Sequence, residues 1–150
     1  MMNRLYFAYG MNMDLAAMAE RCPAARLICP ARLDGHRFGL NRRGVSTVIP
    51  GAGAVVHGLL WTLTGPCEAA LDGFEGIAAG HYVKRDRPVL AVLPGGERPR
   101  RALVYIASDA HPGPPRQPYF DRVRAAARSH GFPEDYLAEL DALLPAGALR

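Results

Sequence analysis

The most regular alternation of side chains in this sequence runs from Ala54 to Thr62. Two interleaved sets of residues share the segment, namely Val55, His57, Leu59 and Trp61 and, between them, Val56, Gly58, Leu60 and Thr62. Successive side chains of a strand point to opposite faces, and both sets here are mostly apolar. The segment therefore predicts a strand that is covered on both faces, one of which faces the interior of a barrel.

Shorter apolar runs, separated by glycine and proline, predict the other strands. They are Arg4 to Tyr9, Ala25 to Leu33 with a continuation beyond Gly35 to Leu40, Val45 to Ile49, Tyr82 to Leu93, and Arg100 to Ala107. We expect Pro50-Gly51 to stop the strand that begins at Val45. The Pro94-Gly95-Gly96 turn predicts that the last two strands form an antiparallel hairpin.

Four further segments predict helices. Asp14 is placed to cap a helix that runs through about Arg21, because its carboxylate can accept hydrogen bonds from free backbone N–H groups. A short helix is expected from Cys67 to Phe74. In the last third of the chain, apolar residues at helical spacing predict two more helices, Pro118 to His130 and Pro133 to Leu144.

Together these elements indicate a fold class. The strands come first and the helices follow, without a regular alternation of the two. This order predicts an α+β fold, namely a small mixed β-barrel or strongly curled sheet with several helices packed around it. A length of 150 residues fits one domain over residues 1–150, and a hydrophobic content of 49% is ample for one continuous core.

The formal net charge of +4 comes almost wholly from arginine, since Lys84 is the only lysine. A basic chain binds nucleic acid when its positive residues cluster into a stripe or patch. Here the arginines are scattered, with only short doublets at Arg42-Arg43 and Arg100-Arg101. We therefore expect no nucleic-acid partner.

The compartment can also be predicted. Nothing near 18 consecutive apolar residues occurs, so we expect no membrane span and no membrane partner. Residues 1–10 lack the apolar core and cleavage site of a signal peptide. Cys22, Cys29 and Cys67 cannot all be paired in disulfides, which suits a reducing compartment. These features predict a cytoplasmic protein.

Sequence motifs for metals, nucleotides and activated nucleophiles are missing. The cysteines form no C-x-x-C pair, and the five histidines show no H-x-x-x-H spacing. The sequence has no glycine-rich nucleotide loop, and no G-x-S-x-G elbow surrounds Ser46, Ser108 or Ser129. We expect neither a metal nor a cofactor.

The first candidate site is the segment Tyr9-Gly10-Met11-Asn12-Met13-Asp14, where a strand runs into a glycine turn and then a helix. Such a junction presents free backbone N–H groups and a positive helix end, which favour a bound carboxylate. The glycine would let a ligand approach the backbone closely. An ordinary strand-to-helix connection has the same pattern, so the spacing alone leaves both interpretations open.

The second candidate site lies between Leu71 and Tyr82. Glu75 stands between two large apolar residues, and partial burial there would raise its pKa and make it a better base near neutral pH. A solvated glutamate at a helix end is the alternative interpretation. Asp72 is a second candidate acid, although its place within the helix suggests a solvent-facing or capping role.

Tyrosines form the third candidate group. Four of them lie at strand ends or beside prolines, where a phenol can line a pocket with its hydroxyl, and these are Tyr9, Tyr82, Tyr105 and Tyr119. We interpret the other two, Tyr6 and Tyr136, as packing residues.

Four blocks of the sequence resemble, in the same order, segments of the gamma-glutamylcyclotransferase family. Residues 6–13 resemble the family's Tyr-Gly-Ser-Asn-Leu loop. Residues 71–76, with 80–83 behind them, resemble its catalytic-glutamate segment. Residues 114–119 and 131–136 are similar to its C-terminal helical region, so the resemblance extends over nearly the whole chain.

This resemblance implies a compact mixed barrel with a cavity at the loop after the first strand. It also implies that Glu75 is the general acid/base, that the substrate loop is Tyr9, Gly10, Met11 and Asn12, and that the pocket walls are Tyr82, Tyr105 and Tyr119. Members release 5-oxoproline from gamma-glutamyl amino acids or related gamma-glutamyl amines, without metal or cofactor. Met11 replaces the serine of the family loop, which bears on the exact substrate and not on the reaction type.

The expected partner is thus a small-molecule gamma-glutamyl substrate, and a homodimer is left open. Two other functions stay as alternatives. One is a related gamma-glutamyl acyl-transfer or deprotecting enzyme that acts on a larger metabolite. The other is a non-catalytic binder of acidic small molecules, which is less favoured because an unneeded carboxylate facing a bound carboxylate would repel it.

Overall fold

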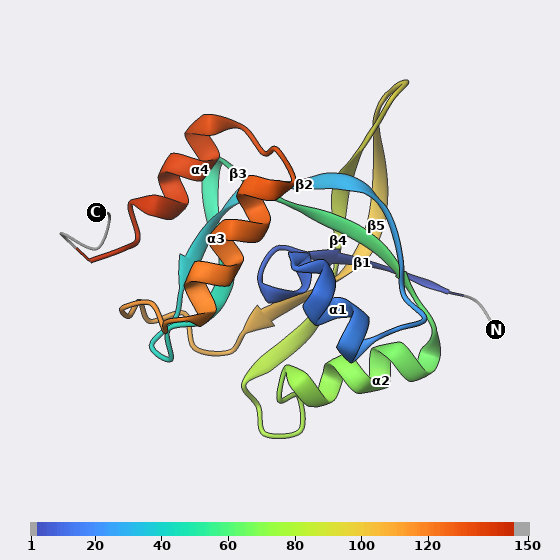
Figure 1. Cartoon of the computed structure of the whole chain (residues 1–150), viewed down its shortest axis with the longest axis horizontal. Coiled ribbons are helices and arrows are strands. Elements are labelled where there is room, and N and C mark those ends of the chain that lie inside the picture. Colours follow the sequence, from blue (N-terminus) through green and yellow to red (C-terminus); the bar gives the residue numbers. More distant parts are fainter. Residues whose placement is uncertain (1–2, 146–150) are drawn as a thin grey trace.

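The structure is a computed structural model that describes residues 3–145. Its elements, in chain order, are β1 (Arg4–Ala8), the 3-10 helix η1 (Met11–Met13), α1 (Leu15–Arg21), β2 (Arg26–Leu40), β3 (Ser46–Leu63), α2 (Gly65–Phe74), β4 (Tyr82–Leu93), β5 (Gly96–Ala107), α3 (Tyr119–Ser129) and α4 (Glu134–Asp141). Figure 1 shows the strands at the centre, with α1 and α2 side by side below them and α3 and α4 along one side. The predicted α+β class is confirmed.

The strands form a curled sheet that closes in the order β1-β3-β2-β4-β5. Neighbouring strands are antiparallel except at the closure, where β1 and β5 are parallel and Tyr6 pairs with Leu103. Close approach of β1 to β3 depends on Gly58, where a Cβ would lie 2.3 Å from the Ala8 carbonyl oxygen. The sheet is therefore mixed and barrel-like, as the order of elements predicted.

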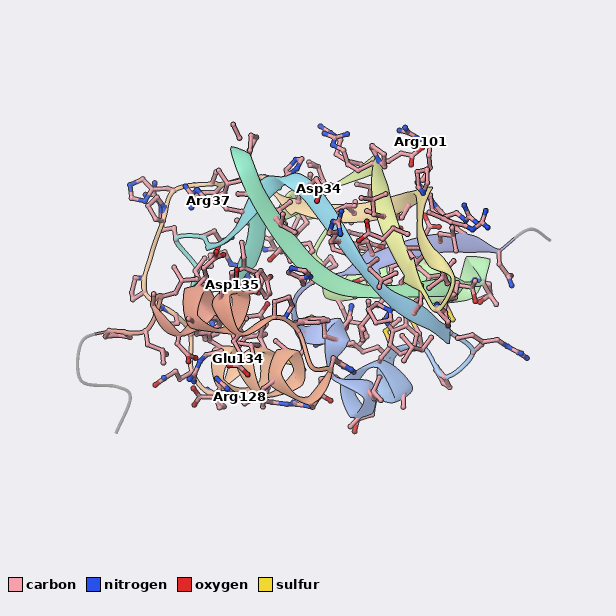
Figure 2. All side chains as sticks on the ribbon, turned by 90° about the horizontal axis from the view of Figure 1, so that it is seen from above. Asp34, Arg37, Arg101, Arg128, Glu134 and Asp135 are labelled. Carbon is pink, nitrogen blue, oxygen red and sulfur yellow. The ribbon has the colours of Figure 1, made fainter. Side chains whose placement is uncertain are left out.

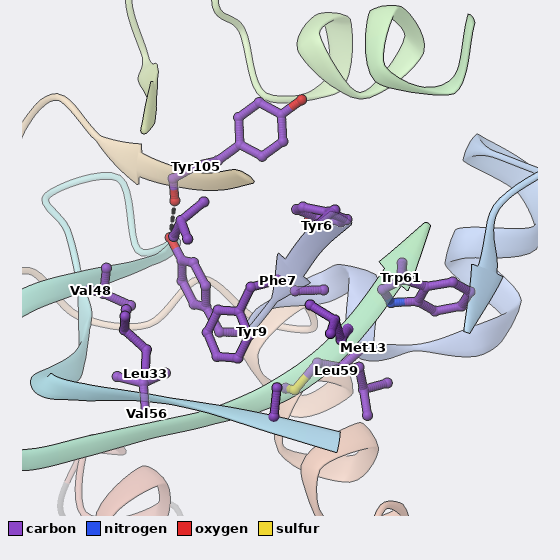
Figure 3. Close-up of a cluster of buried hydrophobic side chains, with 14 of the residues drawn as sticks. Tyr6, Phe7, Tyr9, Met13, Leu33, Val48, Val56, Leu59, Trp61 and Tyr105 are labelled. Atoms are coloured by element: carbon purple, nitrogen blue, oxygen red, sulfur yellow. Dashed lines mark hydrogen bonds between the residues drawn. The ribbon is translucent and has the colours of Figure 1, made fainter. Parts of the chain in front are cut away.

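The interior of the barrel is filled by large apolar side chains. Phe7, Leu60 and Val104 come from three different strands, point to the same face of the sheet and are buried. Figure 3 shows part of the buried core, and Phe7, Tyr9 and Leu59 are among the side chains drawn there. On the outer side, Phe120 of α3 stacks on Phe38 of β2 with ring centroids 6.1 Å apart. The predicted double-sided burial of the strand around Ala54 to Thr62 is thus explained by a barrel core and a helical cover.

One predicted boundary is wrong. Pro50-Gly51 does not end a strand, because β3 runs without interruption from Ser46 to Leu63. Pro50 pairs with His36, whereas the preceding pair in the ladder joins Asp34 to Val55. The extra residues are accommodated by a shift in register at this point, where a proline without an N–H can be tolerated.

The helices α1 and α2 each begin at a capping side chain. The Asp14 carboxylate accepts a hydrogen bond from the Ala17 N–H at 3.0 Å, which confirms it as the cap of α1. The Thr64 hydroxyl caps α2 in the same way through the Cys67 N–H. The Cys22 thiol, at the end of α1, donates to the Cys67 carbonyl at 3.3 Å and so joins the two helices.

The last two helices are tied to the rest of the chain by polar contacts. His130, at the end of α3, donates to the Met13 carbonyl of η1 at 2.7 Å. Arg124 of α3 forms an ion pair with Asp141 of α4 at 2.8 Å. Charged residues of both signs cover the outer surface, including Arg101 on β5 and Arg128, Glu134 and Asp135 on the two helices (Figure 2). No helix in the described part of the chain is long and apolar enough to cross a membrane.

Candidate active site

A cavity of about 220 Å³ opens where the end of β1, the end of α2 and the start of β3 meet. All eight residues that the sequence singled out line it, and these are Tyr9, Gly10, Met11, Asn12, Glu75, Tyr82, Tyr105 and Tyr119. The structure therefore brings together the glycine loop, the acidic segment and the four tyrosines, although Tyr9 and Tyr119 lie 110 residues apart in the chain.

The end of α2 fixes the position of Glu75. Gly76 adopts a φ of 63°, which ends the helix in the left-handed conformation that glycine favours. The Gly76 N–H bonds to the Gly73 carbonyl, and the Ile77 N–H bonds to the Asp72 carbonyl. This pair of bonds is the Schellman arrangement of a helix C-terminus. It makes Glu75 the C-cap residue of α2 and turns the chain back toward β4.

The packing behind this turn leaves little freedom for the chain. A Cβ at residue 76 would lie 2.5 Å from the His81 ring, so only glycine fits there. His81 also donates its backbone N–H to the Gly76 carbonyl at 3.0 Å. The glutamate is consequently held on a rigid corner and not on a loose loop.

Burial dominates the electrostatic surroundings of Glu75. Burial raises the pKa of its carboxyl from the ordinary value to about 7, and the nearby Arg21 guanidinium opposes part of that rise. Within residues 3–145 no hydrogen bond or ion pair engages the carboxylate. A carboxyl with such a pKa can both accept and donate a proton near neutral pH.

Asp72, the other candidate acid, is placed differently. Its carboxylate lies 3.0 Å from Lys84 Nζ and accepts a hydrogen bond of 2.7 Å from the Tyr105 hydroxyl. Lys84 also pairs with Glu68, which in turn binds Arg4 at 3.0 Å. Asp72 does not line the cavity, and its contacts fasten α2 to β4 and β5.

The loop after β1 forms the opposite wall. Gly10 lies so close to β3 that a Cβ there would be 3.1 Å from Ser46 Cβ. The buried Asn12 side chain donates to the Tyr6 hydroxyl and accepts from Arg21, both at 2.9 Å. In the described structure the N–H groups of Met11 and Asn12 bond to no protein acceptor, as is usual in a first helical turn. The loop therefore offers backbone donors at the cavity.

The four predicted tyrosines form the remaining walls, and each hydroxyl has a partner. Tyr9 donates to the Tyr105 carbonyl (dashed in Figure 3), and Tyr82 donates to the Ser46 carbonyl. Tyr119 donates to Ser46 Oγ at 2.9 Å and accepts from the Ser46 N–H at 3.2 Å. Burial raises the pKa of all four phenols, so they are neutral near pH 7.

Tyr6 was expected only to pack. It is buried, as expected, but its ring also lines the cavity and its hydroxyl holds Asn12. Tyr136 does pack, since it is buried and its hydroxyl reaches only the His57 carbonyl, at 3.5 Å.

Sequence reasoning missed several other lining residues, and these are Arg21, Arg43, Val45, Ser46, Phe74, His81 and Arg116. Ser46 lacks any motif, and it becomes part of the site only because β3 passes beside Gly10. Arg21 could have been suspected, because the cap at Asp14 fixes the face of α1 on which it lies. No local signal marks Arg43 or Arg116. Within the part of the chain that the structure describes, no cluster of three histidine, cysteine or acidic residues is placed to hold a metal.

Comparisons with known proteins identify relatives of this chain. The AIG2-like family matches residues 55–140, a segment that contains Glu75 and three of the four wall tyrosines. Gamma-glutamylcyclotransferases of Mus musculus and Homo sapiens are each 30% identical to the chain, over 94% of its length and 79% of theirs. A solved structure of a gamma-glutamyl cyclotransferase superposes with a TM-score of 0.86 at 25% identity, over 99% of this chain and 92% of that one.

The fold, the cavity and these relatives lead to one assignment. Similarity extends over almost the entire chain, and these three relatives carry the same name. The chain is therefore an enzyme that belongs to the gamma-glutamylcyclotransferase family, within the AIG2-like group of proteins.

Proposed function

We propose that this enzyme cyclises a gamma-glutamyl amine or gamma-glutamyl amino acid to 5-oxoproline and releases the free amine, with Glu75 as general acid/base. The observation that carries the proposal is the unpaired Glu75 carboxyl, which has a pKa of about 7 and shares a cavity with the Gly10–Asn12 loop. A proton carrier and a set of backbone donors are the two groups that this reaction requires.

In the proposed reaction the Glu75 carboxylate first takes a proton from the substrate's alpha-ammonium group. The freed amine attacks the gamma-carbonyl carbon, and a five-membered ring closes as the new C–N bond forms. The gamma-amide C–N bond then breaks, and the Glu75 carboxylic acid returns its proton to the leaving nitrogen. The ring nitrogen loses a further proton, which departs with the amine as ammonium, so the enzyme ends in its starting state.

The loop has the second role in this proposal. Negative charge develops on the gamma-carbonyl oxygen during attack, and N–H groups held in place stabilise such a charge strongly. Met11 and Asn12 line the cavity, and their N–H groups have no protein acceptor among residues 3–145, so we assign these groups to the oxyanion or to the glutamyl carboxylate. Met11 places a thioether where the family loop has a serine hydroxyl, so we assign the loop's contribution to its backbone.

The reaction needs little more than this. Because the attacking amine and the carbonyl belong to one molecule, the cavity has only to hold the bent conformer of the substrate. General acid/base catalysis contributes about 10²–10⁴-fold. Buried, hydrogen-bonded tyrosines give the cavity fixed walls for this purpose.

The proposal is tested by incubating the purified protein with a panel of gamma-glutamyl dipeptides and amines. Mass spectrometry should detect 5-oxoproline and an equal amount of free amine for at least one compound. An incubation without protein, measured in parallel, controls for spontaneous cyclisation. If no compound yields 5-oxoproline above that control, the proposed reaction is wrong.

We also propose that the enzyme works in the cytoplasm. All three cysteines are buried free thiols, a state that a reducing compartment maintains.

A further inference from the structure

Two arginines at the mouth of the cavity are not used by the proposed mechanism. Arg43 and Arg116 both line the cavity and both are exposed at its rim. Within residues 3–145 neither side chain forms an ion pair or a hydrogen bond. The neighbouring Arg42, by contrast, does not line the cavity and pairs with Asp109 at 3.2 Å.

The two arginine-bearing segments are held in fixed positions. The buried Asn41 side chain accepts hydrogen bonds from the N–H groups of Arg43 and Val45, at 3.0 and 3.2 Å. Arg116 donates its own N–H to the Gly44 carbonyl at 3.0 Å. Gly44 has a φ of 76°, and a Cβ there would lie 2.6 Å from Arg116 N, so the two segments are in direct contact. Both guanidinium groups therefore extend from anchored backbone.

The charges in the cavity are strongly unbalanced. Glu75 is the single carboxylate among the lining residues, whereas three arginines line the same space. Arg21 is already engaged, because it donates to Asn12 and lies 4.6 Å from the centroid of the Phe74 ring. Its charge also acts on Glu75, whereas the charge of Arg43 acts on Tyr82. Two cations thus remain for a ligand, apart from the acid/base group.

We propose that Arg43 and Arg116 form a subsite for carboxylates on the leaving amine. The preferred substrate is then a gamma-glutamyl compound whose amine part is an acidic amino acid with two carboxylates. A guanidinium group binds a carboxylate through two parallel N–H···O bonds, so two guanidinium groups match two carboxylates. This assignment rests on the proposed function, because that function places the glutamyl part beside Glu75 and the leaving amine toward the mouth.

The test uses three compounds that share one carbon framework. Gamma-glutamylethylamine, gamma-glutamylalanine and gamma-glutamylaspartate carry zero, one and two carboxylates on the leaving amine. We expect kcat/KM to rise about twofold to fivefold with each carboxylate, as for ion pairs near solvent. The rise should weaken in high salt, because exposed charges are screened.

Variants assign the effect to these side chains. The double change Arg43→Gln with Arg116→Gln should bring the aspartate-to-ethylamine ratio of kcat/KM close to one. Lysine at both positions keeps the charges without the planar fork and should restore part of the ratio. Arg42→Gln removes an adjacent charge outside the cavity and is the matched control, so it should leave the ratio unchanged.

Binding separates this inference from the proposed reaction. Dissociation constants for the three compounds, measured by calorimetry with the Glu75→Gln protein, should fall in the same order as kcat/KM rises. If 5-oxoproline forms but the three compounds react and bind equally well, the carboxylate subsite is wrong and the reaction stands. If nothing cyclises, the reaction is wrong, and equal dissociation constants or no binding would overturn the subsite as well.

Discussion

Asp72 and Glu75 lie one turn apart on the same helix, yet their surroundings differ in almost every respect. Asp72 faces the strands, where Lys84 and Tyr105 engage both of its oxygens. Glu75 faces the cavity, where burial raises the pKa of its carboxyl to about 7 and the described residues offer it no partner. Environment, and not residue type, gives two carboxylates different roles. Here the first fastens the helix, and the second is free to exchange a proton.

The largest effect is expected from Glu75→Gln. Glutamine keeps the size of the side chain but cannot carry the proton, so turnover should fall by at least about 100-fold. The thermal midpoint of unfolding should stay at or above that of the wild type, because no hydrogen bond of the described structure is lost. Unchanged turnover would remove Glu75 from the mechanism.

A second effect concerns stability and pH. Between about pH 4.3, where an unfolded glutamate titrates, and pH 7, the folded carboxyl holds a proton that the unfolded one has lost. The free energy of unfolding should therefore fall as pH rises through this window and level off above it. Relative to Glu75→Gln, the wild type should lose on the order of 3–4 kcal/mol across the window, since the two pKa values differ by about 2.7 units and one unit corresponds to about 1.4 kcal/mol.

Urea unfolding of both proteins at pH 5 and pH 8 measures this difference. Other titrating groups are common to the two proteins and cancel in the comparison. A difference that does not change with pH would mean that the Glu75 carboxyl is not desolvated.

A smaller effect should follow Lys84→Met, a change that removes the cation paired with Asp72. The change leaves the partly buried carboxylates of Glu68 and Asp72 without their shared cation. We expect a loss of about 1–2 kcal/mol in unfolding free energy, because two ion pairs, each worth up to about 1 kcal/mol, are lost together. Because Lys84 does not line the cavity, kcat/KM should change far less than in Glu75→Gln. A 100-fold loss of activity at full stability would contradict the division of roles.

The smallest effect is expected for Asp72→Asn. Asparagine can still accept the Tyr105 hydroxyl, and only the charge that faces Lys84 is removed. The cost should be about 1 kcal/mol or less, as for ion pairs near solvent. Turnover should stay close to that of the wild type. Equal damage from Asp72→Asn and Glu75→Gln in the cyclisation assay would show that the two carboxylates work as a pair.

Much of this arrangement could be predicted from the sequence. Strands, the Asp14 cap and the two C-terminal helices depend on local patterns, and the structure has them within a few residues of the predicted ends. Every predicted helix and strand has a counterpart among residues 3–145. The helix expected to reach Leu144 ends earlier, at Asp141. Such patterns are informative because they repeat the geometry of the element itself.

The residues that were missed depend on contacts between distant segments. Ser46 and Arg116 reach the cavity only through the closure of the barrel and the contact of two loops. The wrong strand end at Pro50 has a similar cause. The local sequence favours a break in the strand there, but pairing with β2 continues on both sides of a shift in register. Tertiary pairing overrides local preference at such points.

The most direct measurement of the central claim is the pH dependence of kcat/KM for 5-oxoproline formation between pH 5 and 9. A general base must be ionised in the free enzyme, so kcat/KM should rise with an apparent pKa near 7, the value that burial gives Glu75. Residual activity of the Glu75→Gln protein should lack that step. The same midpoint in both proteins would contradict the assignment of Glu75 as the proton carrier.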